Sequence, residues 1–137
     1  MGLTFGLCPP VDARFVIGSA SYSFHGLTFG ADAAPFIDTQ TGRTMLPLRI
    51  MGEIFHATVK WDGTTNTALL TNHIGQGSLN IYVQVGEELP NNMGQAMIVD
   101  GRVFVPARFV AEMLGATIEW DADAQAVYIS RPEIPFN

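Results

Sequence analysis

The stretch GRVFVPARFVAEMLGATIEWD, from Gly101 to Asp121, repeats the pattern of GRTMLPLRIMGEIFHATVKWD, from Gly42 to Asp62. Aligned without a gap at an offset of 59, residues 42–70 and 101–129 share nine identities over 29 positions. Most other positions exchange one apolar residue for another. Fixed spacing with matched polarity indicates an internal duplication. The identical pairs are Gly42/Gly101, Arg43/Arg102, Pro47/Pro106, Arg49/Arg108, Glu53/Glu112, Ala57/Ala116, Thr58/Thr117, Trp61/Trp120 and Asp62/Asp121.

Each copy predicts a strand, a short helix and a β-hairpin. In the second copy, Asp100-Gly101 is a turn dipeptide, and the β-branched and aromatic run 103–105 predicts a strand. Pro106 suits the first helical position, where its missing N–H leaves no hydrogen bond unmade. A helix over 107–114 is then expected, with Gly115 as its left-handed C-terminal cap. The apolar stripe of this helix consists of Phe109, Val110, Met113 and Leu114.

The first copy follows the same order with one departure. Its helix carries the stripe Ile50, Met51, Ile54 and Phe55, but His56 stands where the cap glycine belongs. A residue other than glycine in the left-handed region costs about 1 kcal/mol. We therefore expect the first helix to end less favourably than the second.

The segments before each copy extend the duplication. Residues 14–24 predict two strands around Gly18, and residues 79–89 predict two strands around Gly86. The fold class expected is α+β, with antiparallel β-hairpins curled around one short helix per repeat and two repeats in a pseudo-symmetric arrangement. Neither helix can bury its stripe alone, so residues 1–137 should form a single domain built from two repeats, about 14–71 and 79–130.

The run LNIYVQV, residues 79–85, carries no charge. The open edge of an antiparallel sheet exposes unpaired backbone groups unless charges or a partner cover them. We therefore expect this run either to be central in its sheet or to be buried in a dimer.

Charge and composition exclude several classes of protein. The net charge is −6 and the seven Lys and Arg residues are scattered along the sequence, which argues against a nucleic-acid partner. No apolar run reaches the roughly 20 residues that span a bilayer. The start MGLTFGLCPP has neither a basic region nor a proper apolar region, so no signal peptide is expected within it. Either the protein is cytoplasmic, or its leader lies outside this sequence.

The repeated phrase, with Trp-Asp after each helix, resembles the copper amine oxidase N-terminal-like domain, also called the stalk domain. The segment FVIGSASYSFHGLTFGADAAPFI is similar to the leading strands of that family, and the resemblance covers about Phe15 to Ile129. It implies a small α+β module of secreted and cell-wall proteins of Gram-positive bacteria. It does not imply oxidase activity, because in amine oxidases this domain is a peripheral stalk. His56 departs from the glycine that is usual in the family.

The sequence predicts no catalytic, cofactor-binding or metal-binding residues. His25, His56 and His73 lie far apart in sequence, and Cys8 is the only cysteine, so ligand spacings for copper or zinc are missing. The serines lack a nucleophile elbow, and no phosphate-binding glycine loop is present. Glu53 and Glu112 are equivalent carboxylates, but catalytic residues usually occur once, whereas residues kept in both copies usually serve the fold.

The same reasoning applies to the other repeated polar and aromatic residues. Arg49 and Arg108 could clamp an anion, but each stands four residues before a Glu, and we expect ion pairs with that Glu or with the Asp that opens the hairpin turn. Trp61 and Trp120 could be two stacking platforms for sugars. Their alternation with apolar residues favours packing in the core.

These observations predict a protein that is not an enzyme. The leading interpretation is a non-catalytic envelope stalk, adhesion or assembly module that mediates protein–protein or cell-wall association. Its partner would be an envelope protein, a cell-wall polymer or another copy of itself, with no nucleic acid and no membrane span. The alternative is a carbohydrate- or peptidoglycan-binding module of a secreted hydrolase. Either interpretation predicts a secreted or cell-wall-associated location.

Overall fold

Strands β6 (Thr44–Pro47) and β11 (Arg102–Pro106) pair at the centre of the fold and come from equivalent places in the two copies. The computed structural model describes residues 7–8, 10–74, 77–132 and 134–135. The two strands run antiparallel, with Leu46 opposite Val105, and both of these side chains are 0% exposed. The strands that open the two copies therefore form a deeply buried pair.

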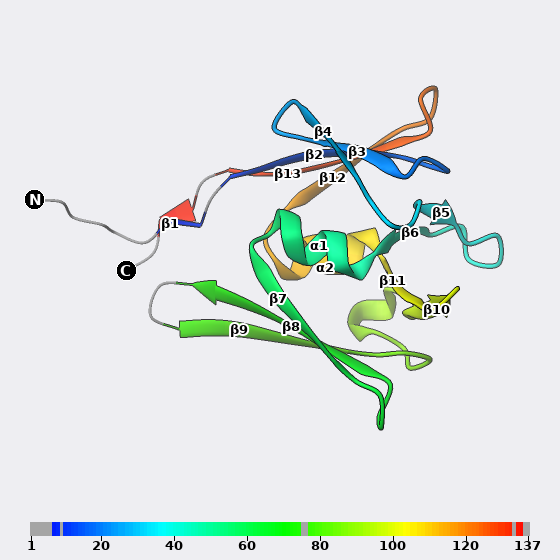
Figure 1. Ribbon diagram of the computed structural model, residues 1–137, viewed down its shortest axis with the longest axis vertical. Coiled ribbons are helices and arrows are strands. Elements are labelled where there is room, and N and C mark those ends of the chain that lie inside the picture. Colours follow the sequence, from blue (N-terminus) through cyan, green and yellow to red (C-terminus); the bar gives the residue numbers. More distant parts are fainter. Residues whose placement is uncertain (1–6, 9, 75–76, 133, 136–137) are drawn as a thin grey trace, which may run out of the picture.

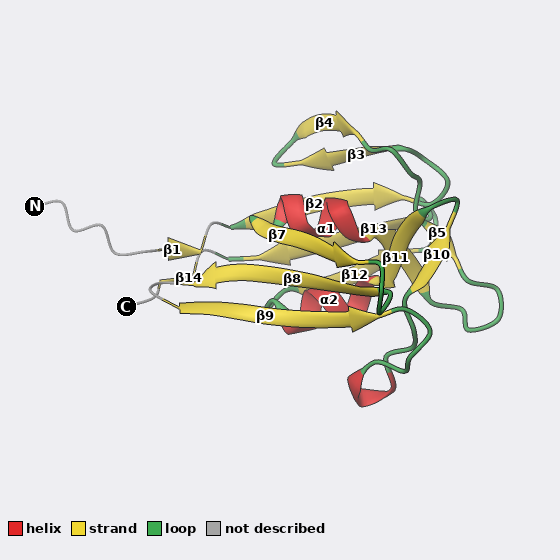
Figure 2. Ribbon diagram, turned by 60° about the horizontal axis from the view of Figure 1, so that its bottom comes forward, coloured by secondary structure: helices red, strands yellow, loops and turns green. Residues whose placement is uncertain are grey.

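Antiparallel sheets surround this pair in the described part of the chain. The central sheet has the order β10-β11-β6-β5, a second has five strands in the order β12-β13-β2-β3-β4, and a third has three in the order β7-β8-β9. Figure 2 shows β1 and β14, which pair with each other, at one end of the molecule. The bounds are β1 Leu7–Cys8, β2 Val11–Val16, β3 Ser21–Phe24, β4 Leu27–Gly30, β5 Phe36–Ile37, β7 Ala57–Asp62, β8 Thr67–Ile74, β9 Gly77–Gln84, β10 Met97–Val99, β12 Thr117–Asp121, β13 Ala126–Arg131 and β14 Ile134–Pro135.

Helices α1 (Leu48–Ile54) and α2 (Ala107–Met113) follow directly after β6 and β11. Figure 1 shows both helices between the five-stranded and the three-stranded sheet. Pro47 stands just before α1 with an extended backbone (φ −61°, ψ 129°), so it caps the helix instead of taking the first helical position. A short 3₁₀ turn, η1 (Pro90–Asn92), follows β9.

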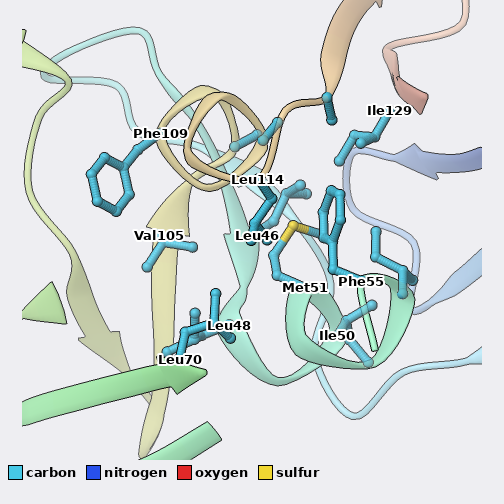
Figure 3. Packing of buried hydrophobic residues seen from close by; sticks show 14 of the residues in the cluster. Leu46, Leu48, Ile50, Met51, Phe55, Leu70, Val105, Phe109, Leu114 and Ile129 are labelled. Atoms are coloured by element: carbon cyan, nitrogen blue, oxygen red, sulfur yellow. The ribbon is translucent and has the colours of Figure 1, made fainter. Parts of the chain in front are cut away.

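One buried cluster takes side chains from both helices and from strands of both copies. Figure 3 shows Leu46 and Val105 with Met51, Phe55 and Leu114 in this cluster. The stripe predicted for the first helix is buried as expected. Burying each large apolar side chain contributes about 1.5–3 kcal/mol, so the cluster dominates the stability of the fold.

The strand that precedes each copy completes the sheet of the other copy. β2, before the first copy, pairs with β13 of the second, and β9, before the second copy, pairs with β8 of the first. Over the described residues the fold is mostly β, with two short helices and antiparallel sheets. The turn predicted at Asp100-Gly101 joins β10 to β11, and both residues have positive φ (51° and 77°), as a two-residue hairpin turn requires.

One prediction about the strands was wrong, and one alternative of a second prediction is excluded. Residues 79–89 do not form a strand pair, because β9 ends at Gln84 and only a single bridge, Glu88 to Gln95, follows. Pro90 and the left-handed Asn91 (φ 59°) turn the chain into η1 before a return strand can form. β9 is also not central, since it lies at one edge of the three-stranded sheet. Burial of this edge in a dimer stays a prediction.

The second helix is turned differently from the prediction. α2 ends at Met113, and this side chain is 39% exposed, although it was assigned to the buried stripe. Ala107 and Ala111 are buried instead, together with Phe109 and Leu114. Small side chains allow close approach to the neighbouring strands, so the helix rests on the alanine face and turns Met113 outward. The side chain of Val110 lies outside the described residues.

Replacing His56 with glycine is expected to stabilise the fold by about 1 kcal/mol, a rise in Tm of about 3–5 °C. His56 occupies the left-handed cap (φ 57°), as Gly115 does after α2 (φ 77°), and its N–H donates to the carbonyl of Glu53 at 3.3 Å. Glycine keeps this hydrogen bond without the clash of Cβ with the backbone. A thermal melt of His56→Gly tests this, and an unchanged or lower Tm would contradict the assignment of the cap.

Candidate binding hollows

Trp61 and Trp120 are 45% and 44% exposed, so the prediction that they pack in the core was wrong. The predicted face was right, because Trp61 lies opposite the buried Ala68 and Trp120 opposite the buried Val127. The error concerns length. A helix of seven residues is about 10 Å long, whereas β7, with six residues, extends about 20 Å. The hairpin is therefore longer than the helix that packs on it, and the tryptophan lies past the end of that helix.

Trp61 lines an open hollow of about 560 Å³, which we call the Trp61 hollow. Arg49, from the first turn of α1, contributes to the same wall. Arg102 and Asp32 line the hollow from the second copy and from the loop after β4, respectively. The hollow thus combines an exposed indole with two guanidinium groups and one carboxylate.

Trp120 lines a second open hollow of about 410 Å³, the Trp120 hollow. Arg108, from the first turn of α2, and Arg43, from the first copy, line it together with Ile37 of β5. No carboxylate is among the described residues that line it.

The two hollows are built from corresponding residues. Of the ten residues that line the Trp120 hollow, nine lie 59 positions from a residue that lines the Trp61 hollow. The tenth, Ile37, pairs with Thr44 as Ile98 of the Trp61 hollow pairs with Val103. The nine pairs are Gly42/Gly101, Arg43/Arg102, Thr44/Val103, Pro47/Pro106, Leu48/Ala107, Arg49/Arg108, Val59/Ile118, Trp61/Trp120 and Ala68/Val127.

One arginine of each hollow is held by the loop that precedes the other copy. Arg102 Nε donates to the carboxylate of Asp32 at 3.0 Å, with both side chains 44% exposed. This hydrogen bond holds the pKa of the Asp32 carboxyl below its usual value, so Asp32 is ionised at neutral pH. Its counterpart Arg43 donates to the carbonyl oxygen of Asn92 at 2.7 Å, which leaves the charge of Arg43 uncompensated by a carboxylate there.

Comparison with known protein families matches residues 23–129 to the copper amine oxidase N-terminal domain. The chain belongs to this family. No curated protein and no solved structure matches the chain. The copper amine oxidase N-terminal domain is a non-catalytic module found in bacterial envelope proteins. In this chain, no described helix is long and apolar enough to cross a bilayer.

In this copper amine oxidase N-terminal domain the repeated arginines do not form the ion pairs expected of them. Among the described residues the salt bridge found is Arg102 to Asp32, and Arg49 and Arg108 are exposed. Asp62 and Asp121 serve the hairpin turns instead: Asp62 accepts from the N–H of Thr64 at 2.9 Å, and Asp121 does the same in the second turn. The carboxylates are therefore engaged by backbone donors within their own turns, and the two arginines face the hollows.

Two buried polar residues of the domain were missed by the sequence analysis. Asn72 donates to the carbonyl of Phe55 at 2.8 Å, and Arg131 donates to the carbonyl of Leu114 at 3.0 Å. Each therefore satisfies a carbonyl at the end of its helix. Arg131 also lies over the ring of Phe55, with 5.2 Å from its guanidinium carbon to the ring centre. The spacing of 59 was a usable signal, but the two residue types differ and lie just beyond the aligned block.

The residues considered for chemistry lie apart. His25 Nε2 donates to the carbonyl of Pro10 at 3.1 Å, and His56 occupies the cap of α1. Glu53 and Glu112 lie exposed on the two helices. Across the described ranges, no group of three or more His, Cys, Asp and Glu residues could hold a metal. The side chains of Cys8 and His73 lie outside the described residues, and the expectation of no catalytic, cofactor or metal residue stays a prediction.

Proposed function

We propose that this chain is a non-catalytic binding module of the bacterial cell envelope, and that it associates with cell-wall glycan through the Trp61 and Trp120 hollows. The observation that carries the proposal is the exposure of two tryptophans in two open hollows lined by corresponding residues. Indole faces suit the C–H faces of sugar rings, since the ring face is negative and the C–H groups are weakly positive. A spacer that only holds domains apart has no need of such groups.

The proposal includes one domain over residues 1–137 in which the two repeats, about 14–71 and 79–130, are related by a pseudo-twofold axis. The register of β6 and β11 supports this, because Leu46 faces its own counterpart Val105. Asn72 and Arg131 occupy equivalent places, each donating to the carbonyl at the end of the helix in its own copy, which is consistent with the same axis. The axis would present the two hollows as two sites for one polymer.

An envelope location, secreted or cell-wall-associated, follows from the family and from the glycan partner that we propose. A Gram-positive source remains the expectation that the family resemblance implies. The assembly interpretation has support of its own in the edge strand β9, whose residues 77–84 carry no charge and whose Tyr82 is 65% exposed. Because the chain carries a net charge of −6, an uncharged edge is where two copies would approach with least repulsion.

Sedimentation with insoluble bacterial cell-wall polysaccharide tests the proposed function. We expect the wild-type chain to co-sediment with the polysaccharide. The double variant Trp61→Ala/Trp120→Ala should bind at least about tenfold more weakly, because aromatic side chains that a ligand covers carry most of the binding energy of such sites. Tyr128→Ala is the matched control, since it removes an exposed aromatic side chain on β13 that lines no hollow with either tryptophan. Unchanged binding of the double variant would contradict the proposal.

A further inference from the structure

We propose that the two hollows bind a polysaccharide whose sugar rings carry carboxylate groups, with a ring over the tryptophan and its carboxylate on the arginine. This inference rests on the proposed function, because it names the ligand class of the same two hollows.

The basic residues of this acidic chain are concentrated at the hollows. The net charge is −6 with only seven Lys and Arg residues, and four of these seven line the two hollows. An acidic protein repels an acidic polymer unless its few positive charges are gathered where the polymer binds. This distribution favours an anionic ligand over a neutral one.

Arg49 and Arg108 are free to receive such a ligand. Both are exposed, and within the described residues no side-chain hydrogen bond of either guanidinium group is found, although the charge of Arg49 does interact with the carboxylate of Asp32. The planar guanidinium group presents paired N–H donors that match the two oxygens of a carboxylate. Arg43, which donates to a backbone carbonyl, adds positive potential beside Arg108, whereas the charge of Arg102 beside Arg49 is compensated by Asp32.

The dimensions of the hollows suit a sugar ring with an acid attached. Their volumes, about 560 and 410 Å³, lie within the usual range for ligand sites of about 300–1,000 Å³. In a uronic acid the carboxylate is attached directly to the ring, so one residue can contact the indole and the guanidinium within one hollow. An acidic peptide carries its carboxylates on flexible side chains and has no comparable ring for the indole.

The two hollows differ by one carboxylate, and this difference sets an order of affinity. Asp32 compensates Arg102 in the Trp61 hollow, whereas the Trp120 hollow holds two arginines and no described carboxylate. A carboxylated sugar should therefore bind more tightly at Trp120 than at Trp61. Removing the charge of Asp32 should reduce the difference.

Titration calorimetry with oligomers of galacturonic acid tests the inference. The matched probe is the methyl-esterified oligomer, which keeps the rings and removes the charge. We expect the acid to bind about tenfold more tightly than the ester, and its binding to weaken several-fold when ionic strength rises from about 0.05 to about 0.5 M. Poly-glutamate and polyphosphate, which carry charge without a carboxylated ring, should bind more weakly than the oligogalacturonate.

Three variants assign the effect to the hollows. Arg108→Gln should weaken the tighter site about tenfold, and Arg49→Gln should weaken the other site. Asp32→Asn should strengthen the weaker site about three- to fivefold and leave the tighter one unchanged. Asp12→Asn, the same change of charge on β2 away from both hollows, should alter neither. Thermal melts of the variants confirm that each is folded.

The outcomes separate this inference from the proposed function. Equal binding of acid and ester, with no effect of salt or of the arginine variants, would overturn the inference while glycan binding stands. Poly-glutamate or polyphosphate binding as tightly as the oligogalacturonate would overturn the sugar assignment in favour of charge alone. Binding of no glycan, acidic or neutral, would overturn the proposed function itself.

Discussion

Replacing Leu46 with alanine is expected to lower the free energy of unfolding by about 3 kcal/mol and to destabilise both halves of the chain together. Leu46 is fully buried opposite Val105, where β6 and β11 join the two copies. Truncating a buried leucine removes its transfer free energy and leaves a cavity, at a cost of about 2–5 kcal/mol. Because the buried cluster includes strands of both copies, neither half should survive the loss on its own.

Denaturant unfolding followed with single-tryptophan variants checks this result. Trp120→Phe leaves Trp61 as the probe of the first copy, and Trp61→Phe leaves Trp120 as the probe of the second. The two probes should report one coincident transition with or without Leu46→Ala. Val99→Ala, at an exposed apolar position on β10, is the control and should change stability by less than about 0.5 kcal/mol. Separate transitions would contradict a shared core.

Replacing Asn72 with alanine is expected to cost about 2 kcal/mol of stability, which is large for one polar side chain on a strand. The amide of Asn72 is buried, and it donates to the carbonyl of Phe55 just after α1. Its removal leaves that carbonyl unpaired away from water, at a cost of about 1–3 kcal/mol. Chemical denaturation measures the change directly.

Asn80→Ala is the matched control for Asn72. Asn80 is exposed on β9, where its side chain accepts a hydrogen bond from the hydroxyl of Thr71 at 3.0 Å. Water replaces that partner at little cost, so this variant should change stability by less than about 0.5 kcal/mol. Equal losses of stability in the two variants would show that the hydrogen bond from Asn72 to the carbonyl of Phe55 does not stabilise the fold.

Local pattern predicted the elements of the repeat well because each has its own chemical signal. The Asp100-Gly101 turn, the buried stripe of α1 and the left-handed cap at His56 all depend on residues next to each other in the chain. The exchange of β2 and β9 between the copies has no such signal. It depends on which distant strand completes a sheet, and strand pairing over long sequence separations leaves no local trace.

The candidate site was predicted only in part, for a related reason. Alternation along β7 and β12 correctly assigned Trp61 and Trp120 to the inner face, but periodicity does not say where the covering helix ends. Arg49 was expected to pair with Glu53 or with Asp62, whereas the fold turns Arg49 toward the hollow. The presence of these residues in both copies was interpreted as a sign that they stabilise the fold. Two equivalent binding sites would produce the same repetition.

The indole N–H signals of Trp61 and Trp120, followed by NMR, test the central claim most directly. The chain has two tryptophans, so Trp61→Phe and Trp120→Phe assign the two signals. As galacturonic acid oligomer is added to the wild-type chain, both signals should shift, and that of Trp120 should saturate first. Two signals that stay in place at saturating oligomer would contradict the account.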